Sequence, residues 1–319
     1  MTSSAAANNY GGEKMELLYW IESWRTPWLD AFFSVITELG GEVFFMAIAI
    51  IFYWCADKGK GYYVLTVGFV GTLINQFLKL MFRIPRPWVQ NPEFTIVESA
   101  RAEATGYSFP SGHTQNAAAT LGCTAMVAGK KALKIALWVI YALVAFSRMY
   151  LGVHTPLDVG VSVVLGVGLT VGLYPLFRNA QENPKRIYAL LGGLTLLGII
   201  YTLFVELFRF PADIDADNLA HGIENGYKLT GAALGMLIGF WMDRKYVHFE
   251  VKAALPTQII KCAVGLIITI GIRVLLKSPL NALIGYTPFA GGVRYFIMVL
   301  FAAGVWPMTF KWWKRVCKE

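Results

Sequence analysis

The stretch GYYVLTVGFVGTLINQFLKLMFRIPRP, residues 61–87, is an apolar run that ends in a group of basic residues. Residues 61–84 are long enough to cross a hydrocarbon core of about 30 Å as one helix. Lys79 precedes Arg86 by about two helical turns, so both side chains can point to one side if the helix runs up to Pro85. The stretch therefore predicts a membrane helix with a cationic group at one end.

The composition of the whole chain is that of a protein that crosses the membrane several times. Of its 319 residues, 56% are hydrophobic and only 15% are charged. Charged or Pro/Gly-rich breaks between the apolar runs predict an all-α fold, a polytopic integral membrane helical bundle of about nine spans. The expected spans are 41–55, 61–84, 112–128, 132–149, 156–177, 187–206, 229–242, 258–276 and 293–310.

The segment before the first expected span has a different character. Trp20, Trp24 and Trp28 alternate there with charged residues, which favours a helix at the level of the lipid headgroups, with a re-entrant element as the alternative. The start of the chain shows no basic region followed by an apolar stretch, so we expect no cleaved signal peptide. A shift in composition at 178–186 marks a boundary in the second half of the chain. The sequence therefore predicts three parts: an interfacial segment at 1–40, a core at 41–180 and C-terminal transmembrane helices at 181–319.

The distribution of loop charge predicts an orientation. The loops at 57–60, 129–134, 178–186 and 243–252, with the tail at 311–319, contain 15 Lys and Arg against 5 Asp and Glu. The loops of the other side contain 10 Lys and Arg against 15 Asp and Glu. Because cytoplasmic loops carry the basic excess, we expect the first set inside the cell and the second outside. No basic stretch interleaved with aromatic residues suggests nucleic-acid binding.

Two more polar stretches fall on the expected outer side, YSFPSGHTQN at 107–116 and SRMYLGVHTPLD at 147–158. Taken singly, their residues have ordinary structural roles. Ser111 resembles a helix N-cap, and Thr155 begins a capping box with Asp158. Cations at helix ends commonly extend their charged groups to the membrane surface. Spans that end at one face of the membrane nevertheless bring both stretches close to the cationic end of 61–87. The presence of all three stretches at one face of the membrane favours a functional site.

The chemistry of this set of residues suits a phosphate group. Free backbone N–H groups at Ser111 and Gly112 and the positive end of the helix dipole favour an anion, and Lys79, Arg86 and Arg148 add donors and charge. Two histidines remain for bond and proton chemistry. His154, oriented by Asp158, can attack phosphorus, and His113 can protonate the leaving oxygen and then activate water.

The three stretches resemble the signature of the type 2 phosphatidic acid phosphatase family. The matching residues are Lys79, Arg86 and Pro87 in the first part, Pro110 to His113 in the second, and Ser147, Arg148, His154 and Asp158 in the third. The resemblance implies a helical core over about 41–180, a phosphohistidine intermediate on His154 and acid/base work by His113. It assigns phosphate binding to Lys79, Arg86, Ser111, Gly112 and Arg148, and it implies no metal requirement and no cofactor.

The expected partners are a membrane lipid phosphate and the bilayer, and the sequence says nothing of an oligomer. The stretch TELGGEVFF at 37–45 and the long helical C-terminal half look similar to the sphingosine-phosphate phosphatase branch. Undecaprenyl pyrophosphate, phosphatidylglycerol phosphate and phosphatidic acid remain alternative substrates. We expect an integral protein of a bacterial cytoplasmic membrane with its active site on the outer face.

Other functional classes are less well supported. The vanadium-dependent haloperoxidases share the motif but are soluble, whereas a non-catalytic lipid-phosphate binder or transporter needs no pair such as His154 and Asp158. Neither disulfides nor zinc is suggested by the cysteines, which lack CxxC spacing, and His221 and Glu224 in the acidic loop at 210–226 lack the spacing of metal ligands. The cysteines are Cys55, Cys123, Cys262 and Cys317.

Overall fold

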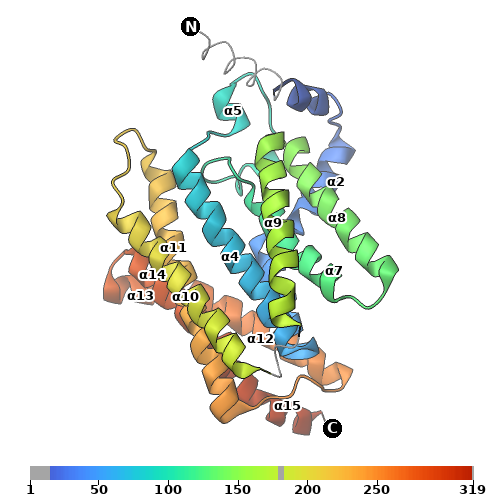
Figure 1. Ribbon diagram of the computed structural model, residues 1–319, viewed down its shortest axis with the longest axis vertical. Coiled ribbons are helices and arrows are strands. Elements are labelled where there is room, and N and C mark those ends of the chain that lie inside the picture. Colours follow the sequence, from blue (N-terminus) through green and yellow to red (C-terminus); the bar gives the residue numbers. More distant parts are fainter. Residues whose placement is uncertain (1–14, 179–182, 318–319) are drawn as a thin grey trace. The chain divides into compact units, whose positions relative to one another are not determined.

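The structure, a computed structural model, describes residues 15–178 and 183–317, and within these ranges every regular element is helical. Figure 1 shows helices joined by loops. The connection from α5 (Pro87–Gln90) to α6 (Gly112–Ala117) is long and contains the 3₁₀ turn η2 (Glu98–Ala100). The all-α fold expected from the sequence is confirmed. Residues 1–14 of the expected interfacial segment lie outside the described part of the chain.

Six helical segments in the described part are long and apolar enough to cross a membrane. They are Lys58–Gln90, Lys131–Tyr150, Pro156–Phe177, Pro184–Leu207, Leu255–Ile284 and Pro288–Val316. The pair Pro27–Glu38 and Glu42–Ala56, bent by 45°, makes a seventh if it is counted as one broken span. The protein is therefore an integral membrane protein, but the expected number of nine spans is not confirmed.

Two expected spans account for most of this difference. The segment expected at 112–128 is a succession of short helices, α6 (Gly112–Ala117), the π-helical turn η3 (Ala118–Gly122) and α7 (Cys123–Val127). The segment expected at 229–242 is the second half of α11 (Ala216–Met242), whose first half carries several polar side chains. The apolar content of the sequence alone therefore did not predict where the helices in these two segments begin and end.

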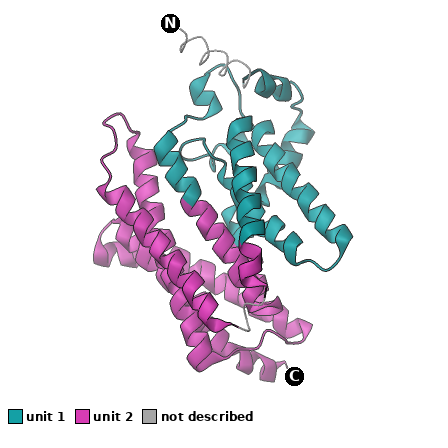
Figure 2. Cartoon of the chain, viewed as in Figure 1, with its two compact units in different colours: residues 1–45, 74–172 teal, residues 46–73, 173–319 magenta. Residues whose placement is uncertain are grey.

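The chain forms two compact units, drawn in different colours in Figure 2. Residues 1–45 and 74–172 make up the first unit, and residues 46–73 and 173–319 make up the second. Three helices contribute to both units, α3 (Glu42–Ile51), α4 (Lys58–Phe82) and α9 (Pro156–Phe177). The three-part division expected from the sequence stays a prediction.

In the first unit, α8 (Lys131–Tyr150) packs against α2 (Pro27–Glu38) and against the successive elements α6, η3 and α7 (Figure 1). Proline at the first position and Thr26 as N-cap begin α2. Its buried face includes Phe33 and Thr37. The remaining elements of the unit are the first residues of α3 (Glu42–Ile51), α5 (Pro87–Gln90) and the 3₁₀ turn η2 (Glu98–Ala100).

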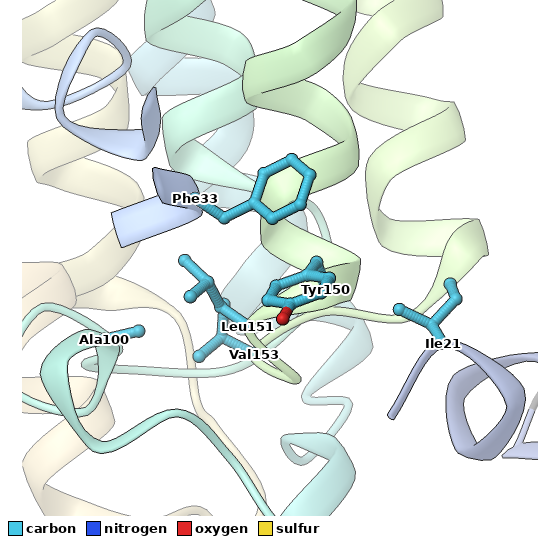
Figure 3. Close-up of a cluster of buried hydrophobic side chains, with 6 residues drawn as sticks. All are labelled: Ile21, Phe33, Ala100, Tyr150, Leu151 and Val153. Atoms are coloured by element: carbon cyan, nitrogen blue, oxygen red, sulfur yellow. The ribbon is translucent and has the colours of Figure 1, made fainter. Parts of the chain in front are cut away.

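One buried apolar cluster of this unit lies directly beside the expected nucleophile. Figure 3 shows the rings of Phe33 and Tyr150 close together, and their centroids are 4.3 Å apart. Leu151 and Val153, the residues that lead from α8 to His154, are fully buried in the same cluster. Burial of this much apolar surface holds the turn before His154 in one conformation.

In the second unit, α11 packs along α10 (Pro184–Leu207) and along α14 (Pro288–Leu300) with its π-helical continuation η6 (Phe301–Val305) (Figure 1). Small residues on α11 allow the close approach, as is common between membrane helices. The other elements are η1 (Phe52–Ala56), η5 (Asp243–Val247), α12 (Leu255–Leu275), α13 (Lys277–Ile284), η7 (Trp306–Thr309) and α15 (Phe310–Val316).

The contact of α11 with α14 predicts an asymmetric response to two glycine substitutions. A Cβ atom at Gly235 would lie 2.8 Å from the Phe296 carbonyl oxygen, so Gly235→Ala must push the helices apart. We expect a loss of about 1–3 kcal/mol, as for overpacked cores. A Cβ at Gly271 on α12 meets no atom within 4 Å. Thermal unfolding in detergent should show a lower Tm for Gly235→Ala than for the wild type, and no decrease in Tm for Gly271→Ala. Equal Tm values for the two variants would contradict this packing.

Candidate active site

Arg86 lies where the long helix α4 is interrupted. Arg83 leaves the helix in the left-handed region with φ of 50°, and Pro85 and Pro87 prevent the helix from continuing through Arg86. Arg86 becomes the residue before α5 and its side chain is buried. Its guanidinium donates to the Thr105 oxygen at 2.7 Å, the Gly106 oxygen at 3.1 Å, the Val153 oxygen at 2.9 Å and His154 Nε2 at 3.0 Å.

Lys79 lies one helical turn before the end of α4 and is also buried. Its ammonium group donates to the Tyr107 carbonyl oxygen. The next residue, Ser108, donates its backbone N–H to the Ile84 oxygen at 2.8 Å. The segment before the PSGH motif is thereby bound to the cationic end of the helix, as the sequence led us to expect.

Ser111 is the N-cap of α6, as predicted. Its Oγ accepts the backbone N–H of Thr114 at 3.4 Å, and its own N–H donates to the Asp158 carbonyl oxygen at 3.2 Å. A Cβ at Gly112 would meet nothing within 4 Å, so the backbone at the start of this helix faces open space. An anion can approach the N–H groups there closely.

Arg148 lies in the last turn of α8, and its side chain is fully buried. Its Nη1 donates to Thr37 Oγ1 at 2.5 Å, while its buried Nε has no partner among the described residues. The Arg148 carbonyl oxygen accepts the backbone N–H of His154 at 3.2 Å. The turn between them includes Gly152, whose φ of 79° is a conformation that glycine adopts readily.

His154 and Asp158 are joined by the start of α9. Thr155 and Asp158 form the predicted capping box: Asp158 Oδ2 accepts the Thr155 N–H at 2.7 Å, and Thr155 Oγ1 accepts the Asp158 N–H at 3.3 Å. The same Oδ2 lies 3.6 Å from His154 Nδ1. Ser108 Oγ donates to this oxygen at 2.5 Å and lies 3.4 Å from the same imidazole nitrogen.

These contacts define the state of the His154 ring. Arginine can only donate, so His154 Nε2 accepts from Arg86 and therefore carries a lone pair. The proton is then on Nδ1, on the side of Asp158 and Ser108. Burial, together with the positive charge of Arg86, lowers the pKa of His154 well below its ordinary value, which keeps the imidazole neutral. A neutral imidazole with an oriented lone pair is suited to nucleophilic attack.

His113 is the second residue of α6 and is less buried than His154. Its Nε2 lies 2.8 Å from Oε2 of Glu103, a half-exposed residue of the loop before the motif. The hydrogen bond from His113 lowers the pKa of Glu103, so the carboxylate is ionised. The backbone behind His113 is approached by Gly40, where a Cβ would lie 2.6 Å from the His113 carbonyl oxygen.

The structure brings the eight site residues expected from the sequence into one region of the first unit. Their catalytic and phosphate-binding roles stay predictions. Sequence reasoning missed Ser108, Thr37 and Glu103, which contact Asp158, Arg148 and His113. Ser108 and Thr37 lie in stretches already marked as unusual, whereas nothing in the sequence distinguishes Glu103 from its loop neighbours. Among the residues described, no three His, Cys, Asp or Glu side chains are placed to hold a metal ion.

Two parts of the chain match a known protein family. Residues 59–182 match the PAP2 superfamily, and residues 227–317 match the transmembrane extension of PAP2 superfamily phosphatases. The first match includes all eight site residues, and the second covers most of the C-terminal helices.

Three characterised relatives are similar over long parts of the chain. A dihydrosphingosine 1-phosphate phosphatase of Schizosaccharomyces pombe is 34% identical over 72% of this chain, which covers 56% of the relative. Phosphatidylglycerophosphatase B of Bacillus subtilis is 30% identical over 51% of this chain and 80% of its own length. Lipid A 4'-phosphatase of Porphyromonas gingivalis is 31% identical over 56% and 84%.

The position of Ser108 predicts a loss of activity on Ser108→Ala. The substitution removes a 2.5 Å hydrogen bond to a buried carboxylate, which destabilises Asp158 and the ring that it orients. We expect kcat for a lipid phosphate to fall about tenfold to a hundredfold, corresponding to about 1–3 kcal/mol. Ser99→Ala, which breaks an exposed hydroxyl pair with Ser34, is the matched control and should leave kcat unchanged. Equal kcat values in both variants would remove Ser108 from the site.

Proposed function

The chain belongs to the PAP2 superfamily, and from that premise we propose that it is a lipid phosphatase that works through a phosphohistidine on His154. The contact that carries the proposal is the one between Arg86 and His154 Nε2, at 3.0 Å. It places a cation that can hold a phosphoryl oxygen beside a nitrogen that can attack phosphorus. A protein that only bound lipid phosphate would need the cation but not the oriented imidazole.

The reaction has two steps. The Arg86 N–H turns from His154 Nε2 to a phosphoryl oxygen, which frees the Nε2 lone pair. Nε2 then attacks phosphorus while the bond from phosphorus to the lipid oxygen breaks, and His113 gives that oxygen a proton. In the second step, His113 takes a proton from water, whose oxygen attacks phosphorus, and the bond from phosphorus to His154 breaks to release phosphate. Asp158 stabilises the charged His154 ring in between.

Phosphate binding falls to the cations and to the start of α6. Arg86 and Lys79 already make hydrogen bonds to backbone oxygens, which hold their side chains in place. Arg148 has a buried Nε available as a donor, and Gly112 leaves the backbone N–H groups of the helix start accessible. Such a preorganised set stabilises the charge of a five-coordinate phosphorus.

For the substrate we propose a sphingoid-base phosphate. The similarity to the sphingoid-phosphate relative extends over 72% of this chain, against 51% for the phosphatidylglycerophosphatase and 56% for the lipid A phosphatase. The longer match includes part of the C-terminal helices as well as the core. Phosphatidic acid, phosphatidylglycerol phosphate and undecaprenyl pyrophosphate are the alternatives to compare.

The intermediate provides the direct test of this chemistry. Wild-type protein in detergent should form an acid-labile, base-stable phosphoenzyme, and His154→Ala should form none and should release no phosphate from any lipid. Asp158→Asn should lose most but not all of its turnover, because the ring keeps its place but loses the charge that stabilises it. Phosphate release is measured across the sphingoid-base, glycerol and polyprenyl phosphates.

Metal removal separates this mechanism from one that depends on a metal. Because Lys79, Arg86, Arg148 and the helix N-terminus supply the positive charge, turnover should persist in EDTA. Strong inactivation that added metal reverses, or a phosphoenzyme that persists in His154→Ala, would contradict the proposed mechanism.

We further propose that the active site opens to the outer face of the membrane, on the strength of the loop charges. In a background with the native cysteines replaced by serine, a cysteine at the exposed position Glu93 should react with an impermeant maleimide added to intact cells. A cysteine at Lys130, also exposed, should react only after the membrane is permeabilised. The reverse labelling would place the site on the cytoplasmic face. The bacterial cytoplasmic membrane as its location stays a prediction.

A further inference from the structure

Each of the two site histidines has a carboxylate on one ring nitrogen. Asp158 lies on the Nδ1 side of His154, and Glu103 lies 2.8 Å from Nε2 of His113. The two pairs use opposite nitrogens, so they leave opposite nitrogens for chemistry. Asp158 is a signature residue, whereas Glu103 belongs to the loop between the first two parts of the signature.

Within the proposed function, on which this inference rests, we propose that Glu103 is a positioning residue for His113. Its carboxylate accepts the Nε2–H of His113 and so keeps a proton on that nitrogen. Nδ1 is then the atom that exchanges protons, first with the leaving lipid oxygen and then with water. Glu103 itself stays ionised and touches no reacting atom.

The charges around His113 explain why such a partner is needed. The charged groups that act on this ring are Glu103, Arg148 and Arg86. Burial of the ring and the two guanidinium groups oppose the imidazolium form that must donate a proton, and Glu103 is the only one of the three charged groups that favours it. Glu38, on α2, is a further carboxylate near Glu103 and Arg148, and its charge reaches the same region. A neutral residue at 103 therefore leaves the imidazolium opposed by both cations.

The surroundings of the two carboxylates predict that Asp158 acts more strongly on His154 than Glu103 acts on His113. Asp158 is fully buried and accepts from Ser108 and from the Thr155 backbone as well as facing His154. The Glu103 side chain is 49% exposed, so water screens its charge. Loss of Glu103 should therefore lower turnover by less than loss of Asp158.

The loop supplies a matched control. Glu98 is also exposed, but it pairs with Arg101 at 2.7 Å on the surface of the loop and contacts no site residue. Glu98→Gln removes the same charge from the same loop as Glu103→Gln. A difference between the two variants therefore reports on the contact with His113 and not on the net charge of the loop.

The experiment measures kcat and KM against pH for Glu103→Gln, Glu103→Asp and Glu98→Gln. The two substrates are a sphingoid-base phosphate, whose alkoxide needs a proton to leave, and nitrophenyl phosphate, whose leaving group needs little help. For the lipid we expect Glu103→Gln to lower kcat about tenfold with little change in KM, since general acid catalysis is worth about a hundredfold or more. The effect on nitrophenyl phosphate should be much smaller.

The pH profile carries the second readout. The proton donor must be imidazolium, and loss of the Glu103 charge lowers the pKa of that form in the enzyme–substrate complex. The alkaline limb of kcat should therefore move to lower pH in Glu103→Gln, return part of the way in Glu103→Asp and stay in place in Glu98→Gln. In a His113→Ala background, Glu103→Gln should cause no further loss.

Three results would overturn the inference. They are an equal loss with both substrates and no shift of the pH profile, an additive loss in the His113→Ala background, and wild-type kinetics in Glu103→Gln. Each is distinct from failure of the proposed function, in which the wild-type protein itself forms no phosphoenzyme and releases no phosphate. A phosphoenzyme in the wild type together with unaltered Glu103→Gln kinetics would reject the role of Glu103 alone.

Discussion

The burial of Arg86 is the constraint around which the site is built. A guanidinium group removed from water is costly unless its N–H groups find acceptors. Here two stretches of chain supply them, because backbone oxygens at Thr105, Gly106 and Val153 all accept from this one side chain. The loop before PSGH and the turn before His154 are thus held on either side of the same cation. The fourth acceptor is the proposed nucleophile itself.

Pro85 and Pro87 determine where the helix before Arg86 is interrupted. Helix α4 ends at Phe82, and Pro85 and Pro87 prevent a helix from continuing through Arg86. The Arg86 side chain is buried, and Lys79 lies one turn before the end of α4. One short segment therefore contains both the prolines that interrupt the helix and the two cations, Lys79 and Arg86. The sequence of 61–87 therefore placed Lys79 and Arg86 in one region, whereas their roles in phosphate binding stay predictions.

Some of the signature residues also obey a local rule that can be read without the fold. Ser111 caps a helix and Thr155 forms a capping box with Asp158, and both features appear in the structure. Thr37 and Glu103 obey no such rule, since their contacts with Arg148 and His113 join segments far apart in the sequence. The expected number of nine spans is not confirmed for a related reason: α11 extends from Ala216 through polar residues, so its ends could not be located from hydropathy alone.

The two histidines differ in a way that fits the order of the chemistry. His154 is buried between Arg86, Asp158 and a packed apolar cluster, so water has little access to the nitrogen that we propose attacks phosphorus. His113 is more open, and its carboxylate partner is half exposed. A general base that activates water has to meet water, and a covalent intermediate has to be shielded until that moment. In the proposed mechanism, the burial of His154 and the greater exposure of His113 keep attack on phosphorus apart from the activation of water.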